Sequence, residues 1–371
     1  MKRGTNSALM KENNRRLILN LIRRGSYSRV DIANITGLTK ATVTILTDEM
    51  IQEGLIKEEN QYELTGVGRR PVYLRLCEES LFAVGFSLTR TGYQAGLFNF
   101  AGETVEAEDC QYSDGTAENT LEDMAKIVKR YKSKIPEGSM VGIGFASPGP
   151  IDYKAGIVLN PPNFEKWHNC KVVEKLSAMC GVPVILENIS NALAIGEQYF
   201  GSCRNEDNYA YIVIDEGIGS GIVVNGQVYR GESGCGNELG HTSVRFDGLP
   251  CICGNRGCLE CYASIPAILK NTGYKTWREA VDCGDYELIE REAEYLACAL
   301  VTLINLFDLV KIVLGGDIAY KGEIIAEILR NKVEMRTIVR HPVRVSSSST
   351  EQNKAVAAAA AALHNLFFTL Q

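Results

Sequence analysis

A short cysteine-rich segment places the tightest constraint on how this 371-residue chain folds. Cys251 and Cys253 are separated by one residue, and Cys258 follows five positions after Cys253. His241, one of only four histidines, lies ten residues upstream of Cys251. Three thiolates and one imidazole are the ligand set of a closed structural zinc site, and such soft ligands disfavour magnesium or calcium. The spacing predicts one structural Zn²⁺ within residues 241–258; buried free cysteines are the alternative.

The remaining cysteines and the N-terminus narrow the class of protein. Twelve cysteines in a chain of this length suggest buried thiols and metal ligands rather than a disulfide framework. The sequence contains no apolar run of eighteen or more residues, and its N-terminus enters charged, helix-forming sequence without an apolar secretory core. We therefore expect a cytoplasmic protein with no membrane partner.

Charge is distributed unevenly along the chain. Residues 1–76 contain thirteen Lys and Arg against eight Asp and Glu, a net charge of +5. The remaining residues contain 26 against 37, a net charge of −11. A small basic segment ahead of a large acidic one indicates an anionic partner for the first segment alone.

The basic segment carries a recognisable helical pattern. Residues 8–24 predict a helix with one apolar face. Ser28 begins a short second helix with Asp31 three residues on, which is a capping-box pattern. Gly37 lies in the turn that follows, and Thr39 caps a third helix. Two helices joined by a short glycine-containing turn are typical of a helix-turn-helix.

The third helix and the sequence after it indicate a nucleic-acid surface. Short polar side chains occupy the N-terminal end of this helix, where a recognition helix meets bases and phosphates in the major groove. Two short alternating strands follow, which predicts a winged helix-turn-helix whose tip carries two arginines. The candidate DNA-contacting residues are Ser28, Arg29, Thr39, Lys40, Thr42, Thr44, Arg69 and Arg70. A helical module for dimerisation or protein binding is the alternative.

From residue 82 onward, strands alternate with helices, and several strands run into glycine-rich loops. This pattern predicts an α/β body in which the loops lie where such sheets bind ligands. The segment DEGIGSG at 215–221 fits a phosphate-binding loop or a tight hairpin turn equally well. We expect two parts, residues 1–76 and residues 77–371.

Taken together, the motifs resemble the ROK family of sugar kinases and transcriptional repressors. The family signature, E-x-G-H followed by C-x-C-G-x-x-G-C-x-E, is matched by ELGH at 238–241 and CICGNRGCLE at 251–260. The family's P-G-P loop is matched by ASPGPID at 146–152. The resemblance implies a two-lobed, actin-like (ribonuclease-H-like) α/β fold after the winged helix-turn-helix, and a winged helix-turn-helix marks the repressor branch, which resembles xylose and N-acetylglucosamine regulators.

The resemblance also implies a sugar site. Family members contact sugar hydroxyls through the glutamate of E-x-G-H, the zinc-bound histidine and the glutamate after the last cysteine, and the zinc is structural. Carried onto this chain, the sugar-binding residues are Gly149, Asn188, Glu238, His241 and Glu260.

The kinase chemistry of the family is disrupted in this sequence. Ile189 stands where family kinases carry the aspartate that takes a proton from the sugar hydroxyl, and an aliphatic side chain cannot accept a proton. Ser87 replaces the aspartate of the first phosphate loop, and Glu216 sets a carboxylate where kinases place a threonine. We therefore expect no catalytic residues and no enzyme activity.

The sequence thus favours a sugar-responsive repressor of carbohydrate-utilisation genes. We expect it to bind double-stranded operator DNA as a homodimer or homotetramer and to release the operator when a sugar inducer binds. The rival is an active ATP-dependent sugar kinase with an accessory DNA-binding segment, and Ile189 discriminates the two. A ligand-independent repressor opened by a partner protein is disfavoured because the sugar-binding residues are retained.

Overall fold

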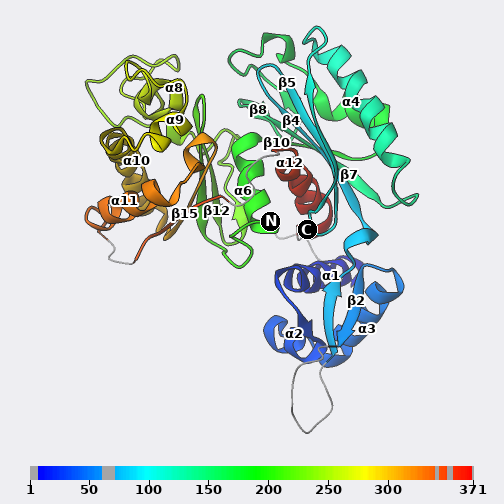
Figure 1. Cartoon of the computed structure of the whole chain (residues 1–371). Coiled ribbons are helices and arrows are strands. Elements are labelled where there is room, and N and C mark those ends of the chain that lie inside the picture. The colour runs from blue at the N-terminus through cyan, green and yellow to red at the C-terminus, as the bar shows by residue number, and fades with distance from the viewer. Residues whose placement is uncertain (1–6, 61–71, 339–341, 349–353, 370–371) are drawn as a thin grey trace. The chain divides into compact units, whose positions relative to one another are not determined.

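The computed structural model describes residues 7–60, 72–338, 342–348 and 354–369 (Figure 1). The chain forms two compact units. The first comprises Met1–Pro148, Tyr153–Glu187 and Asn353–Gln371, and the second comprises Gly149–Asp152 and Asn188–Gln352. The expected DNA-binding segment, residues 1–76, belongs to the first unit, and residues 77–371 are divided between the two.

The N-terminal part of the first unit packs three helices against a small antiparallel sheet. The helices are α1 (Ser7–Arg24), α2 (Arg29–Thr36) and α3 (Lys40–Gln52). The strands β1 (Tyr27–Ser28), β2 (Ile56–Asn60) and β3 (Val72–Leu76) pair in the order β1-β3-β2. Fully buried side chains from these elements form a common core: Ile18, Ile32, Val43, Met50 and Leu74. The two predicted strands are confirmed, and the predicted arginine pair, Arg69 and Arg70, lies outside the described residues.

Local capping explains where α2 and α3 begin. The Ser28 hydroxyl accepts the Asp31 backbone N–H at 3.2 Å, and the Asp31 carboxylate accepts the Ser28 N–H at 3.0 Å. Thr39 accepts the Thr42 N–H at 3.1 Å in the same way. Gly37 ends α2 with φ = 72°, which only glycine adopts without strain. The predicted capping box, turn and cap are confirmed, and each side-chain cap contributes about 1 kcal/mol to helix stability.

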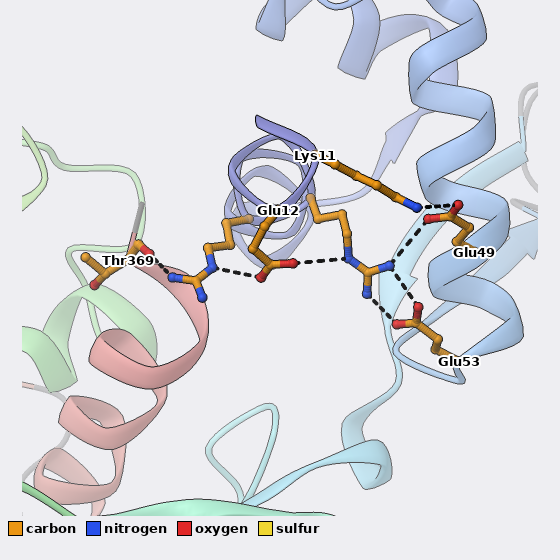
Figure 2. Close-up of polar contacts among 7 residues, drawn as sticks. Lys11, Glu12, Glu49, Glu53 and Thr369 are labelled. Carbon is orange, nitrogen blue, oxygen red and sulfur yellow. Dashed lines mark hydrogen bonds and ion pairs between the residues drawn. The ribbon is translucent and has the colours of Figure 1, made fainter. Parts of the chain in front are cut away.

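Ion pairs fix α1 against α3, as Figure 2 shows. The Lys11 ammonium lies 2.7 Å from the Glu49 carboxylate, and Arg15 donates to Glu53 at 2.8 Å. On its other side, α1 contacts the chain's C-terminal turn, because Arg16 donates to the Thr369 carbonyl. The first helix therefore joins α3 to the C-terminal segment within the first unit.

A five-stranded sheet and the helices around it form most of the rest of the first unit. Its strands are β4 (Phe82–Leu88), β5 (Gly92–Asn99), β6 (Thr104–Gln111), β7 (Met140–Ser147) and β10 (Val184–Asn188), in the order β10-β7-β4-β5-β6. The alanine-rich helix α12 (Lys354–Leu363) packs directly on this sheet. A Cβ atom at Gly144 would lie 1.7 Å from the Ala358 carbonyl oxygen, so glycine at 144 permits this close approach. Helices α4 (Ala117–Lys132) and α5 (Val172–Cys180) pack on each other.

The second unit contains another five-stranded sheet. Its strands are β11 (Tyr209–Ile214), β12 (Ile218–Val224), β13 (Gln227–Val228), β14 (Lys311–Gly315) and β15 (Arg344–Ser347), in the order β13-β12-β11-β14-β15. Three helices accompany it: α6 (Ile189–Tyr199), α10 (Tyr286–Phe307) and α11 (Glu323–Glu334). Apolar residues of the sheet, α10 and α11 form one continuous core.

The two sheets share one strand plan. In each, three consecutive strands run antiparallel, and a later strand pairs parallel with the first of them: β7 with β4, and β14 with β11. This repeated arrangement confirms the two-lobed α/β fold that was expected after the winged helix-turn-helix. Within the described segments, none of the helices is both long enough and apolar enough to span a membrane.

Candidate functional site

Four donor atoms of the second unit converge on one point. The His241 Nδ1 atom lies 3.6 Å from Cys251 Sγ, and the sulfurs of Cys253 and Cys258 are 3.7 Å apart. All four atoms lie within 4.8 Å of one another. Zinc bonds of about 2.3 Å to sulfur and about 2.0 Å to nitrogen give tetrahedral edges of about 3.8 Å and about 3.6 Å. The donor set therefore has the spacing of a closed tetrahedral metal site.

The backbone of residues 241–258 is folded to bring these donors together. Gly257 has φ = 70°, and a Cβ atom there would lie 1.6 Å from the Arg245 carbonyl oxygen. The Gly254 N–H donates to the Cys251 carbonyl at 3.0 Å, which closes the turn that contains the first and second cysteines. The neighbouring Cys261 thiol lies 4.0 Å from the Pro250 carbonyl oxygen and is not one of the four donors.

The thiols of this cluster differ strongly in acidity. Burial opposes ionisation of Cys251, but hydrogen bonds from the Cys253 backbone N–H, Cys253 and His241 outweigh it and lower the Cys251 pKa to about 7. Burial, with hydrogen bonds and negative charge from Cys253 and Cys251, raises the pKa of Cys258 to about 12. The cluster thus holds one thiolate readily and resists a second, and a divalent cation between the sulfurs would remove that conflict.

Next to the cluster, three predicted residues meet. Asn188 caps α6, because its Oδ1 accepts the Ser190 N–H at 2.8 Å. This bond leaves the Asn188 Nδ2 atom beside Gly149, 3.0 Å from where a Cβ atom at 149 would lie. The Glu238 Oε1 atom lies 3.9 Å from the same point. The structure therefore places Gly149, Asn188 and Glu238 around one small volume of the second unit.

Glu260 is held against the turn between β11 and β12. It begins the short helix α7 (Glu260–Ala263), and its Oε2 accepts the Ile218 N–H at 2.8 Å. The Glu238 side chain is exposed, yet partial desolvation and the Glu260 charge raise its pKa while His241 lowers it. Two carboxylates, an imidazole and an amide N–H₂ thus offer acceptors and donors suited to a hydroxyl-rich ligand.

Ile189 is the first residue of α6 and directly follows Asn188. Its side chain is half-buried. The position that the sequence analysis compared with a catalytic aspartate therefore lies at a helix N-terminus beside the predicted sugar residues, and it carries no titratable group.

The two predicted phosphate loops are tight turns in which Thr89 and Asp215 accept hydrogen bonds from nearby backbone N–H groups. Residues 215–217 connect the antiparallel pair β11 and β12, so the hairpin interpretation of this segment is confirmed. The Asp215 carboxylate accepts the Asp317 N–H at 2.7 Å. In the other unit, Thr89 Oγ1 accepts the Gly92 N–H at 3.0 Å and closes the turn after β4. Ser87 is fully buried in β4, and Glu216 is exposed.

The predicted DNA-contacting residues lie at the start of α2 and on α3, but several already have partners. The Ser28 hydroxyl is buried and donates to Asp31 at 2.7 Å. The Arg29 guanidinium lies 2.6 Å from both Asp48 and Glu58, so it links α2 to α3 and β2. Thr39 and Thr42 hydrogen-bond to each other at 2.9 Å.

Two further observations concern α3 itself. Lys40 is exposed, and the Thr44 hydroxyl donates to the Lys40 carbonyl at 2.9 Å. Ile45, which the sequence analysis did not single out, has a side chain that is 58% exposed. The sequence does contain a signal for this exposure. Ile45 directly precedes Leu46 and therefore falls outside the buried stripe of α3, Val43, Leu46 and Met50.

Comparison with known proteins agrees with this architecture. The ROK family model matches residues 83–365. The xylose repressor of Bacillus subtilis (strain 168) is 29% identical over 338 residues, which cover 88% of this chain and 87% of the repressor. The glucokinase of Thermotoga maritima is 33% identical over 276 residues, which cover 67% of this chain and 86% of the glucokinase.

A solved structure extends the similarity to nearly the whole chain. The crystal structure of a ROK family transcriptional regulator, described as a homolog of the E. coli MLC protein, superposes with a TM-score of 0.80 at 26% identity. The match covers 97% of both chains. The expected actin-like ROK fold is confirmed, and with a family match over most of its length, this chain belongs to the ROK family.

Proposed function

We propose that this protein is a sugar-responsive transcriptional repressor. Residues 1–76 form a winged helix-turn-helix that binds operator DNA, and residues 77–371 bind the sugar that releases it. The observation that carries the proposal is the extent of the matches. A match over 97% of 371 residues leaves about eleven residues unaligned, so similarity to the regulator includes most of residues 1–76. The glucokinase match covers only 67% of the chain.

In the DNA-binding part, α3 is the recognition helix and the β2–β3 hairpin is the wing. Lys40 and the exposed N-terminal turn of α3 face the phosphates and bases, with Thr39, Thr42 and Thr44 beside them. Arg29 fixes α2 relative to α3 and β2 through its ion pairs with Asp48 and Glu58. The protein binds as a homodimer or homotetramer, since helix-turn-helix proteins read two half-sites about one helical turn apart.

In the sugar-binding part, each predicted residue has a definite role. Glu238 and Glu260 accept hydrogen bonds from sugar hydroxyls, and the Asn188 Nδ2 donates one. Gly149 leaves room for the ring, because a Cβ atom there would lie 3.0 Å from the Asn188 amide. His241 has its Nδ1 turned to Cys251, so its Nε2 is the nitrogen that serves the sugar.

A structural zinc ion is part of this proposal. His241, Cys251, Cys253 and Cys258 would hold it, and their donor spacing fits a tetrahedral ion. Zinc in such a site supplies folding free energy and no catalytic water. It would fix His241 and hold Glu260, two residues after Cys258. We call the side chains proposed to contact the sugar, Asn188, Glu238, His241 and Glu260, the sugar wall.

The rival function is an ATP-dependent sugar kinase with an accessory DNA-binding segment, which the similarity to a glucokinase favours. Phosphoryl transfer in this fold needs a base at the sugar hydroxyl, and Ile189 offers none. We therefore propose that the protein binds sugar without phosphorylating it.

A two-step experiment tests the repressor function. The full chain is used to select duplexes from a random DNA pool, and a panel of sugars is then screened by thermal shift and by displacement of the selected duplex. We expect at least one sugar to raise the melting temperature and to dissociate the duplex, because a ligand of the folded state stabilises it. Failure to enrich any duplex, or ATP turnover at about 1–100 s⁻¹ with any sugar, would contradict the proposal.

A further inference from the structure

The outward face of α3 carries a small apolar patch in its first two turns, where a recognition helix normally presents hydrogen-bonding side chains. The inward face consists of Val43, Leu46 and Met50, which are all buried. A helical period of 3.6 residues places Ala41, Thr44 and Ile45 together on the opposite face, and all three are exposed.

Hydrogen bonding within α3 accentuates this character. The Thr44 hydroxyl donates to the Lys40 carbonyl at 2.9 Å, so the outward group of Thr44 is its methyl. Ala41 at i, Thr44 at i+3 and Ile45 at i+4 therefore form one continuous strip of methyl groups. We call Ala41, Thr44 and Ile45 the methyl strip. Ile45 contributes most of its area, because its side chain is 58% exposed.

The charges around the strip are arranged to tolerate an anionic partner. Asp48 lies one turn beyond Thr44 on the exposed side of the helix, where its carboxylate would repel phosphates. Its Oδ1 lies 2.6 Å from an Arg29 guanidinium nitrogen, which weakens that repulsion, and the same guanidinium also pairs with Glu58. Lys40 is exposed at the N-terminal end of the strip. Lys40 supplies a cation at one end of the strip, and the ion pair of Asp48 with Arg29 limits the repulsion at the other end, so the strip can approach the phosphates of a DNA groove.

We propose that the methyl strip, with Ile45 as its centre, reads thymine C5-methyl groups in the major groove. Thymine presents a methyl group that no other base presents there, and alanine, threonine methyls and larger apolar side chains recognise it by contact. This inference rests on the proposed DNA-binding function and adds a specificity determinant to it. It predicts that Ile45 selects A·T pairs at one or two positions of each half-site.

Deoxyuridine tests the inference directly, because it differs from thymidine only by the absent methyl. Each thymine of the duplex selected by the full chain is replaced singly by deoxyuridine, and the dissociation constant is measured at fixed salt. We expect about a fourfold loss of affinity at each thymine that Ile45 contacts, the value for burying one methylene-sized group. Ile45→Ala should bind the thymine duplex more weakly and should lose this fourfold distinction.

Ile35→Ala is the matched control. Ile35 is the same residue type, is also 58% exposed and lies on α2 of the same segment. We expect this variant to keep the thymine-to-deoxyuridine ratio of the unchanged protein. Because Ile45 is exposed, Ile45→Ala should fold, and an unchanged melting curve will confirm it.

The outcomes separate the inference from the function beneath it. If the full chain selects no duplex, the DNA-binding function itself fails. If it selects a duplex but deoxyuridine is neutral at every position, or Ile45→Ala keeps the same distinction, the strip does not read thymine. A change of oligomeric state in Ile45→Ala, with the distinction intact, would make Ile45 a contact between copies of the chain and overturn the inference.

Discussion

The metal loop at 241–260 and the turns at 87–92 and 215–217 use their polar side chains in opposite ways. In the loop, three thiols and an imidazole face one another, and burial together with the neighbouring Cys253 and Cys251 raises the pKa of Cys258. In the turns, Thr89 and Asp215 satisfy backbone N–H groups of their own surroundings. The donor atoms of the loop have the spacing that a metal ion requires, whereas Thr89 and Asp215 in the turns already serve the backbone.

This contrast gives a physical reason for a ROK-family member to bind sugar without transferring phosphate. A site evolves away from catalysis most simply when its polar groups acquire local partners, because a group already satisfied gains little from a ligand. Asn188 and Glu238 lie around one volume at Gly149, and Ile189, which directly follows Asn188, has no proton-accepting atom.

Removing a metal ligand should have the largest effect on this comparison. Apparent binding free energies of structural zinc sites are about 10–16 kcal/mol, so Cys258→Ala should leave the second unit largely unfolded or insoluble. Cys261→Ala is the control, since that thiol lies outside the donor set. Elemental analysis of protein purified without added metal should give one zinc per chain for the unchanged protein and for Cys261→Ala. A stoichiometry near zero in soluble, folded protein would show that the loop needs no ion.

The next largest effect should come from the sugar wall. Glu260→Gln keeps the hydrogen bond from Ile218 but removes the charge. Hydrogen bonds to charged groups are worth about 1.5–3 kcal/mol, so sugar affinity should fall about 10- to 150-fold while operator affinity is unchanged. Glu216→Gln, on the exposed turn, is the matched control and should leave both affinities alone. Titration calorimetry with the inducing sugar measures the change. An equal loss of sugar affinity in Glu260→Gln and Glu216→Gln would contradict the proposed role of Glu260 in binding the sugar.

Glu292, elsewhere in the second unit, is a buried carboxyl group without hydrogen-bond partners among the described residues. It lies on the buried face of α10 with Leu288 and Leu296. Burial raises its pKa well above the ordinary value, which favours the neutral form of the carboxyl group in the folded protein. Unlike the metal loop, it is surrounded by apolar core and faces no ligand group.

The raised pKa of Glu292 determines how the free energy of unfolding changes with pH. Folding takes up a proton at Glu292 above its unfolded pKa of about 4.3, so its contribution to stability is lost as pH rises towards the folded pKa. Glu292→Gln stays neutral and should be the more stable protein, by about 1–3 kcal/mol once the carboxyl would ionise. Denaturant unfolding between pH 5 and pH 9 should show the difference growing with pH. A difference that is constant or shrinks with pH would mean that Glu292 is not buried as a neutral acid.

The parts of this molecule that the sequence predicted are those specified by nearby residues. The capping box of Ser28 with Asp31, the Thr39 cap and the inward stripe of α3 depend on spacings of three or four residues. The four-donor cluster was also predictable, because its members lie within eighteen residues and thiol chemistry leaves few alternatives. Each of these features depends on residues that lie close together in the sequence.

The rest required contacts between distant segments. The Ile218 N–H that anchors Glu260 and the Asn188 amide beside Gly149 come together only when the second unit is folded. Arg29 reads as a free cation in the sequence, yet its charge is shared with Asp48 and Glu58, eighteen or more positions away. Strand order is likewise set by packing, so the repeat of one plan in both sheets could not be predicted from local patterns.

The smallest expected effect is the most informative about the turns. Ile189→Asp restores a carboxylate at the start of α6, where the helix N-terminus stabilises negative charge, so the side chain should fold into place and be ionised. Even so, we expect no measurable transfer of phosphate from ATP to the inducing sugar. Ser87 lies fully buried in β4, and Glu216 adds negative charge at the β11–β12 turn, so the two turns remain unsuited to binding ATP.

The control is the affinity of Ile189→Asp for the sugar, measured by calorimetry; an unchanged affinity shows that the sugar-binding residues are intact. Turnover by Ile189→Asp at ordinary kinase rates, about 1–100 s⁻¹, would mean that the turns still bind ATP and that one residue alone separates this protein from the kinases.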